Sequence, residues 1–363
     1  MAELFNIPSD IVFSSGLNDI VIPTDKDFLN LSLKDPEDET IYDEQLNAHE
    51  GKVTVTDISE IIELDMRRKN KVFSVYKFYV RDRDSSGLQK EYYELKVIYC
   101  EAASLLKESA ASFIDNNFLT TLDTRRVPSD ARFSLFICSE NIQSYGYDMQ
   151  VYYRLKDSDE IESYVSSPPI HGSGLFEIEI DIPVIRKSRA NVLGIDERQI
   201  EIVSFSIRHE NRYAAFFVDK SLDTGKAFYF KNIFNVIDSA FFPALVKSKT
   251  EVSRSLASVG NVSMFYDRSV SKTFEIESGP VDIREAGLIA QLVASPAAFV
   301  VMDDNSPDLS LKEILITDSD ASFDDSDDTK SVKFTWRFTD NRPAFLFSDS
   351  KRIFTSQFNK VFS

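Results

Sequence analysis

Apolar and polar residues alternate in short segments throughout the first hundred residues. Alternation with a period of two is the pattern of a strand with one buried and one solvated face. Charged, turn-rich stretches such as Pro36–Glu39 and Asp82–Gly87 separate the segments, which is typical of a β-sandwich. We therefore predict a first β-sandwich domain over residues 1–100. Its expected strands lie in Asn18–Ile22, Phe28–Leu33, Gly51–Asp57, Lys71–Val80 and Glu91–Cys100.

The same order of segments recurs further along the chain. Gly51–Ile62 contains an alternating strand, and the pair Asp57-Ile58 then opens a short helix in which Glu60 completes a capping-box spacing. Leu175–Lys187 repeats this pattern, with Asp181-Ile182 as the helix start. We predict a second β-sandwich over residues 119–229 as a repeat of the first. Chance likeness between alternating strands is the alternative.

Residues 101–118 lack alternation and are rich in Ala, Leu and Lys, which favours a helix connecting the two sandwiches.

The pattern changes again in residues 230–343. An amphipathic helix is expected after Asp282, with Glu285 three residues later. Two strands follow, in Glu313–Thr317 and Ser331–Phe338. We predict an α+β domain with one covering helix. The fold class is thus mainly β, with two tandem β-sandwich domains followed by this α+β domain and by an arm over residues 344–363.

The last predicted strand has a clear buried face. Val332, Phe334, Trp336 and Phe338 alternate with polar residues. Burial of each of these side chains is worth about 1.5–3 kcal/mol. Trp336, the only tryptophan of the chain, is therefore expected in the core.

Charge and composition narrow the function. The chain of 363 residues has a formal charge of −18 and no basic stripe with interleaved aromatics, so nucleic acid is not an expected partner. Met1–Phe13 lacks the pattern of a signal peptide, and no run of about 18 apolar residues occurs, so we expect synthesis in the cytoplasm without membrane insertion. Cys100 and Cys138 are expected as reduced core thiols, with a disulfide as the alternative.

Catalytic motifs are weak. His171–Gly174 places a serine between glycines, but a strand is expected after it where a nucleophile elbow needs a helix. The three histidines and two cysteines are too scattered for a zinc site. A carboxylate pair in a cleft would indicate a hydrolase, but sequence does not give that separation. We expect no enzymatic activity and no cofactor.

An acidic run precedes the tryptophan strand. Asp318, Asp320 and Asp324 are candidate calcium ligands, since the calcium-loop template places oxygen ligands at alternate positions. With the loop starting at Asp318, Phe323 stands where the template has glycine and Thr329 where it has glutamate. The preferred interpretation is a solvated connection between two strands, with calcium binding as the alternative.

The C-terminal arm combines aromatic and basic residues. Phe354, Phe358 and Phe362 are spaced by four, beside Lys351 and Arg352. A helix here would present an aromatic stripe and positive charge to an acidic neighbour. Packing of this arm on its own domain is the alternative.

Residues 230–343 carry a resemblance to a known family. The segments Phe234–Gly260, Ser271–Pro296 and Glu313–Phe338 resemble a protein that recurs in tail-gene clusters of phages and prophages of Bacteroides-type gut bacteria. The resemblance implies a tail, baseplate or fibre-associated virion protein that assembles with copies of itself and with other tail proteins. The alternative function is a glycan-binding or adhesin-type sandwich, in which Ser144–Tyr153 would contact a host-surface glycan.

Overall fold

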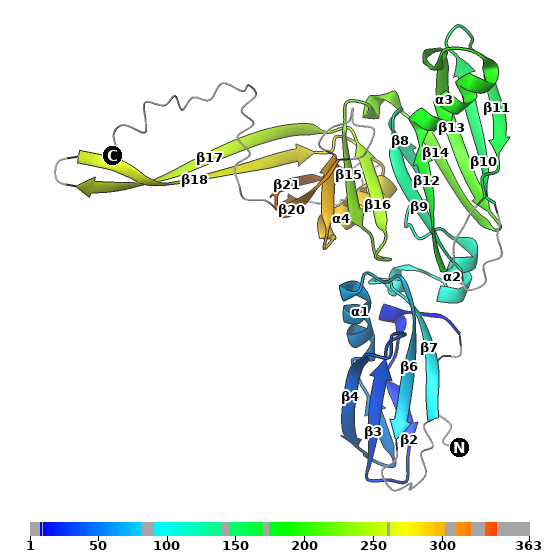
Figure 1. The fold of residues 1–363 in the computed structure, drawn as a ribbon, viewed down its shortest axis with the longest axis vertical. Coiled ribbons are helices and arrows are strands. Elements are labelled where there is room, and N and C mark those ends of the chain that lie inside the picture. The colour runs from blue at the N-terminus through cyan, green and yellow to red at the C-terminus, as the bar shows by residue number, and fades with distance from the viewer. Residues whose placement is uncertain are drawn as a thin grey trace, which may run out of the picture.

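The computed structural model describes residues 8, 10–81, 91–139, 146–169, 174–259, 262–301, 310–320 and 331–339. These residues form three units in chain order, and strands dominate all three, which confirms the mainly β fold. In Figure 1 the first unit lies at the bottom, the second at the upper right, and the third beside the second with a long hairpin pointing away from both.

The first unit is a five-stranded sheet with a two-stranded ribbon and a helix against one face. The sheet order is β1-β7-β6-β3-β4, and β1 is parallel to β7. The ribbon pairs β2 with β5. Alternation places Leu31, Tyr76 and Leu95 in the core between the layers, together with Ile62 of the helix. The elements are β1 (Val12–Phe13), β2 (Ile20–Pro23), β3 (Phe28–Lys34), β4 (Thr40–Asn47), β5 (Lys52–Val55), α1 (Ile58–Arg68), β6 (Phe73–Arg81) and β7 (Glu91–Ile98).

The start of α1 differs from the predicted capping box. Asp57 precedes the helix, but its backbone is left-handed (φ 61°, ψ 16°) and its side chain makes no cap hydrogen bond. The Asp57 carboxylate accepts a hydrogen bond from Thr56 Oγ1 instead, at 3.1 Å. An N-cap normally has extended backbone, which aims its side chain at the free N–H groups of the helix. The capping-box prediction is therefore wrong at Asp57.

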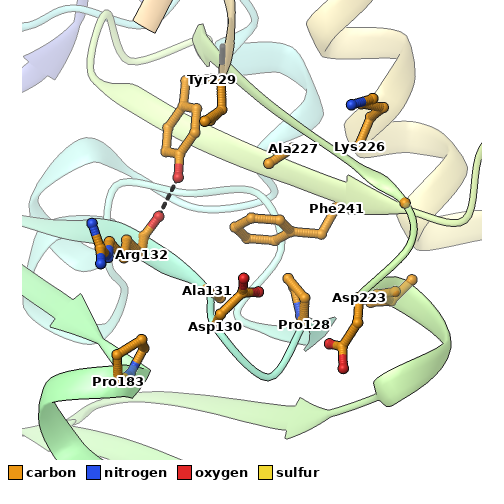
Figure 2. A pocket seen from close by; sticks show the side chains of 13 residues that line it. Pro128, Asp130, Ala131, Arg132, Pro183, Asp223, Lys226, Ala227, Tyr229 and Phe241 are labelled. Atoms are coloured by element: carbon orange, nitrogen blue, oxygen red, sulfur yellow. Dashed lines mark hydrogen bonds between the residues drawn. The ribbon is translucent and has the colours of Figure 1, made fainter. Parts of the chain in front are cut away.

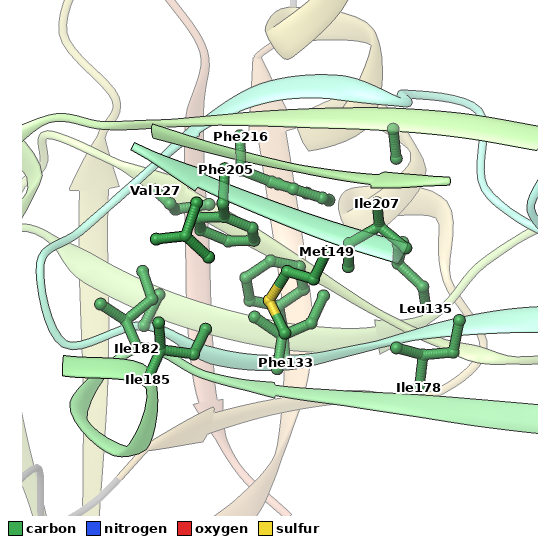
Figure 3. Packing of buried hydrophobic residues seen from close by; sticks show 14 of the residues in the cluster. Val127, Phe133, Leu135, Met149, Ile178, Ile182, Ile185, Phe205, Ile207 and Phe216 are labelled. Carbon is green, nitrogen blue, oxygen red and sulfur yellow. The ribbon is translucent and has the colours of Figure 1, made fainter. Parts of the chain in front are cut away.

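The second unit has the same topology as the first. Its sheet order is β11-β10-β13-β14-β8, with β8 parallel to β14, and β9 pairs with β12 as the separate ribbon. The core between the layers contains Phe133, Phe205 and Phe216 around Met149 (Figure 3). The elements are β8 (Thr124–Val127), β9 (Arg132–Ser139), β10 (Asp148–Leu155), β11 (Ile161–Ser166), β12 (Gly174–Asp181), α3 (Ile182–Leu193), β13 (Ile200–His209) and β14 (Arg212–Val218).

The stretches matched in the sequence occupy equivalent places in the two units. Gly51–Ile62 contains β5 and the start of α1, and Leu175–Lys187 contains most of β12 and the start of α3. Here the Asp181 side chain does cap its helix, accepting from Val184 N at 2.9 Å. The two units therefore share strand order, ribbon and helix position.

The helix between the sandwiches is shorter than predicted. Only α2 (Ala110–Asn116) and a 3-10 turn over Ala103–Leu105 are helical within 101–118. Ser109 caps α2 through Ser112 N, and Asn117, with extended backbone, ends it. Phe113 of α2 stacks on Phe234 with ring centroids 5.0 Å apart, in a core cluster to which all three units contribute. The segment thus fills a junction.

The third unit is a seven-stranded sheet covered by one helix. The strand order is β16-β15-β19-β20-β21-β18-β17. Asp282 caps α4, accepting from Arg284 N and Glu285 N at 2.8 Å, as the sequence predicts. The sheet starts at Lys226, slightly before the predicted boundary. The elements are β15 (Lys226–Lys231), β16 (Ile237–Phe242), β17 (Leu245–Val259), β18 (Val262–Glu277), α4 (Ile283–Ala294), β19 (Ala298–Val301), β20 (Leu311–Asp320) and β21 (Lys333–Phe338).

No helix in the described part of the chain is long and apolar enough to cross a membrane.

Candidate interaction surfaces

A buried ion pair joins the second and third units. Arg125 Nη1 of β8 donates to Asp238 Oδ1 of β16 at 2.7 Å and to the Ser239 carbonyl at 2.8 Å. Thr120 and Asn232 donate to the other oxygen of Asp238. Both charged side chains are almost fully buried, at 2% and 3% exposure. A buried pair with this many partners fixes the geometry of its surroundings.

Further polar contacts tie the units together. Arg126 donates to both oxygens of Glu285 in α4, at 2.8 and 2.6 Å, so this glutamate binds across the junction and is not part of a capping box. The first unit contacts the third through Glu101 N, which donates to the Ile233 carbonyl at 3.0 Å. Asn235 Nδ2 donates to the Lys71 carbonyl at 3.2 Å. The three units therefore form one connected body.

A projecting two-stranded ribbon, formed by β17 and β18, leaves the third unit. The two strands pair from Leu245↔Glu277 to Val259↔Val262. Only Phe274–Glu277 of β18 also pairs with β21. From Lys249↔Thr273 outward the ribbon therefore has no third strand within the described residues, and Figure 1 shows it extending far from the rest of the molecule.

The base of the ribbon is anchored by aromatic stacking. The Phe274 ring of β18 lies over Trp336 of β21, with centroids 4.2 Å apart and planes at 13°. Trp336 is buried in the core of the third unit, as the alternation predicts, next to Phe334 and Val332. Lys272 Nζ lies 5.0 Å from the Phe274 ring centroid. The ribbon thus leaves the sheet from a rigid support.

The charge of the ribbon is opposite to that of the whole chain. Between Lys247 and Thr273 the sequence has five basic and two acidic residues, whereas the chain carries −18. This segment therefore has a net formal charge of +3.

A second exposed surface is the outer face of the second unit's sheet. Tyr152, Ser204 and Phe217 share one cross-strand row, with Tyr213 further along the same strand as Phe217. Tyr152 is 40%, Tyr213 48% and Phe217 53% exposed. One strand, β13, lies between the strands of Tyr152 and Phe217, so two strand spacings, about 10 Å, separate the two residues. The face presents spaced aromatic side chains with serine hydroxyls between them.

A cavity of about 170 Å³ lies between the second and third units (Figure 2). Pro128 and Arg132 line it from one side and Tyr229 and Phe241 from the other. The Tyr229 hydroxyl donates to the Arg132 carbonyl across the junction. Its lining includes no Ser, Cys or His from the part of the chain that the structure describes. The contacts in this cavity hold the two units together, and its lining residues do not indicate a reaction.

The structure describes two of the three candidate calcium ligands. Asp318 and Asp320 lie in β20, opposite Thr335 and Lys333 of β21. The first acidic residues thus extend the strand and are not part of the connection after it, which corrects the predicted strand end. Asp324 lies outside the described residues, and among those described no group of three metal-binding side chains occurs.

Of the other predicted residues, some lie outside the described part of the chain and some are placed by the structure. Lys351, Arg352, Phe354, Phe358 and Phe362 of the arm lie outside the described residues, as does His171. Cys100 and Cys138 are both buried in the core cluster where the three units meet and form no disulfide, so the disulfide alternative is wrong.

The sequence interpretation missed the projecting ribbon. A signal for it exists, since the Gly260-Asn261 dipeptide lies between Val259 and Val262, which pair with each other. A Gly-Asn pair between two alternating segments is a hairpin signature. The length of the ribbon was hidden because its outer part has serine and threonine at many positions where a core-facing strand has apolar residues.

Comparisons with known proteins give no family. No family model matches the chain, and no curated protein matches it. Among solved structures, trypsin-activated alpha-2-macroglobulin from Escherichia coli aligns over 74% of this chain and 22% of that chain, with 7% identity and a TM-score of 0.19. The native conformation of E. coli alpha-2-macroglobulin aligns over 86% of this chain and 21% of that chain, with 11% identity and a TM-score of 0.15. The chain spans about a fifth of the length of either protein, and such low TM-scores carry no argument about function.

Proposed function

We propose that this chain is a structural virion protein of a phage tail region and that it acts by assembly with copies of itself and with other tail proteins. The observation that carries the proposal is the projecting ribbon, which extends beyond its sheet with no third strand from Lys249↔Thr273 outward among the described residues. The resemblance of residues 230–343 to tail-cluster proteins also supports this proposal.

The physical reason lies in the stability of such a ribbon. An isolated pair of strands is marginally stable in water, because it buries little apolar surface and leaves both outer edges unpaired. Strands of 15 and 16 residues are long for a hairpin without a third strand. A neighbouring chain that adds a strand or covers one face would supply the missing burial and hydrogen bonds.

Charge gives the ribbon a preferred kind of neighbour. A basic ribbon on an acidic protein is attracted to the body of another copy or to another acidic subunit. The buried Arg125–Asp238 pair fixes the third unit on the second, so the ribbon projects in a defined direction. A fixed direction is what a repeating assembly requires, because closed symmetric contacts depend on the angle between subunits.

A shortened ribbon tests this function. Thr250 pairs with Lys272, so Glu251–Ser271 can be replaced by Asn-Gly, which makes a two-residue hairpin turn at that rung. The change leaves the stacking of Phe274 on Trp336 and the pairing of β18 with β21 in place. We expect the shortened chain to fold and to stay monomeric in sedimentation velocity at concentrations where the full chain associates.

The control keeps the ribbon and changes another exposed apolar site. Leu105 is 73% exposed and lies far from the ribbon in sequence and fold, so Leu105→Ser should associate like the wild type. Equal association of the shortened and full chains would refute the role of the ribbon. Fluorescence of Trp336 shows whether the sheet at its base is intact in each variant.

A second candidate function is glycan binding by the outer face of the second unit. Exposed aromatic rings stack on sugar rings, and hydroxyls between them can hydrogen-bond, so Tyr152, Phe217 and Ser204 form a suitable row. A polysaccharide that binds the folded state should raise the melting temperature, and Tyr152→Ala with Phe217→Ala should abolish the rise. No rise with any host-surface polysaccharide would exclude this function.

A further inference from the structure

A cavity of about 240 Å³ opens at the end of the second unit where β10 and β14 end and β13 begins. Its floor is apolar, formed by Ile200, Ile202 and Val218. Four basic side chains line it, and one acidic side chain, Glu201, accompanies them. The basic residues are Lys156, Arg186, Arg198 and Lys220.

The single carboxylate is already neutralised. Glu201 Oε1 accepts from Lys220 Nζ and from Arg154 Nη2, each at 2.9 Å. The hydrogen bonds from Arg154 and then those from Lys220 hold the pKa of Glu201 below its usual value, so it stays ionised and paired at neutral pH. It is therefore not available to the other three cations.

The remaining cations have no ion-pair partner among the described residues. Arg186 Nη2 donates to the Ser129 carbonyl at 2.6 Å, which positions the guanidinium but does not neutralise it. The Asp196 carboxylate accepts the backbone N–H of Arg198 at 2.8 Å and forms no ion pair with its guanidinium. Lys156 is exposed at the start of the turn after β10. Three cations without a carboxylate partner among the described residues thus face one cavity, in a chain with a charge of −18.

The first unit shows how the same place in the fold is neutralised from within. Asp35 begins the turn after β3, the strand equivalent to β10, and therefore corresponds to Lys156. Lys69 Nζ lies 2.6 Å from Asp35 and 2.9 Å from both Glu39 and Asp65. In that unit, carboxylates of the chain surround the cation. In the second unit Lys156 stands at the position of Asp35, and Gly194 stands at the position of Lys69 after the helix, so this place in the fold has no such internal cluster of carboxylates within the described ranges.

We infer that the cavity lined by Lys156, Arg186 and Arg198 is a binding site for a doubly charged oxyanion of the phosphate or sulfate type. Two guanidinium groups offer paired N–H donors to such an anion, and Lys156 adds a point charge. A single carboxylate would leave most of the positive charge unbalanced. The anion can be a free ion or a group on a polyanionic polymer, and both sources share this chemistry.

Calorimetric titration of the full chain with inorganic phosphate at low ionic strength tests the site. We expect binding that weakens about tenfold in Lys156→Gln and in Arg198→Gln, because each removes a charge-assisted contact. Both side chains are exposed, so the variants should keep the wild-type melting temperature. Lys187→Gln is the matched control, an exposed cation of α3 outside the cavity, and should bind like the wild type.

Two polymers distinguish the sources. Tighter binding of dextran sulfate than of phosphate, with the same loss in the variants, would support the site and assign it to a polymer. Tight binding of polyglutamate with no binding of phosphate would overturn the inference and indicate an acidic protein segment. No binding of phosphate or dextran sulfate, or equal binding by the Lys156 and Arg198 variants, would also overturn it. The shortened-ribbon chain should bind phosphate normally, so this result is independent of the proposed assembly.

Discussion

Arg125 and Asp238 form an ion pair of 2.7 Å that is buried at the junction of the second and third units. The guanidinium carbon of Arg125 also lies 5.2 Å from the Phe133 ring centroid and 5.7 Å from that of Phe216. The cation is thus placed against two aromatic faces as well as its carboxylate, which offsets part of the cost of burial. This pair fixes the base from which the ribbon projects.

Loss of one partner of this pair should be costly. We expect Arg125→Met to lower the free energy of unfolding by about 3–5 kcal/mol, because it leaves the Asp238 carboxylate buried without its cation. The double variant Arg125→Met/Asp238→Leu should be less destabilised than Arg125→Met alone. Denaturant unfolding followed by Trp336 fluorescence measures the free energy of unfolding of both variants. A double variant at least as unstable as Arg125→Met alone would contradict this coupling between the two residues.

The stacking at the base of the ribbon gives a second prediction. Trp336→Ala should cost about 3–5 kcal/mol, because it leaves a cavity in the core under Phe274. Trp336→Phe keeps an aromatic ring and should cost much less. Thermal melting monitored by circular dichroism compares the two. Similar melting temperatures for Trp336→Ala and the wild type would contradict the core position of this residue.

The pH dependence of stability can be tested at Glu63. Burial, and then the charge of Glu101, raise its pKa above the usual 4.5 despite a hydrogen bond from Ser14 Oγ at 3.0 Å. The folded state then binds a proton more readily than the unfolded state, so ionised Glu63 destabilises the fold above the raised pKa. Glu63→Gln should therefore raise the melting temperature at neutral pH, and this gain should disappear as the pH falls to about 4.5.

Glu197→Gln is the control for this measurement, since Glu197 is exposed and outside the junction. Its melting temperature should follow the wild type at every pH. A Glu63→Gln gain that persists unchanged below the usual glutamate pKa would mean that the effect comes from packing and not from ionisation.

The thiols give a fourth prediction. Burial raises the pKa of Cys100 to about 12, so almost no thiolate is present at pH 8. Neither Cys100 nor Cys138 should react with a disulfide reagent in the folded chain, and both should react in denaturant. Rapid reaction of one thiol without denaturant would show that the cluster at the junction opens.

Local patterns in the sequence were sufficient for much of the fold. The alternation at Val332, Phe334 and Trp336 depends only on which face meets the core, and these residues are buried as predicted. The start of α4 was predictable because Asp282 is a residue type that caps helices and its backbone is extended, as an N-cap requires. Asp57 does not follow the same rule because its backbone is left-handed and its side chain makes no cap hydrogen bond to α1.

Other features depend on contacts that no local pattern contains. The basic cavity brings together Lys156, Arg186 and Lys220, which come from three different parts of the second unit. The buried role of Asp238 depends on Arg125, more than a hundred residues earlier. The projecting ribbon is distinguished by the lack of a third strand among the described residues, and strand pairing depends on the whole sheet.

The central claim, that the projecting ribbon is an assembly surface, is tested most directly by amide hydrogen exchange over β17. We predict that amides of Glu251–Val259 exchange quickly at concentrations where the chain is monomeric and are strongly protected once it associates with copies of itself. Equal exchange at both concentrations, while the chain associates by sedimentation, would place the contact elsewhere and contradict the claim.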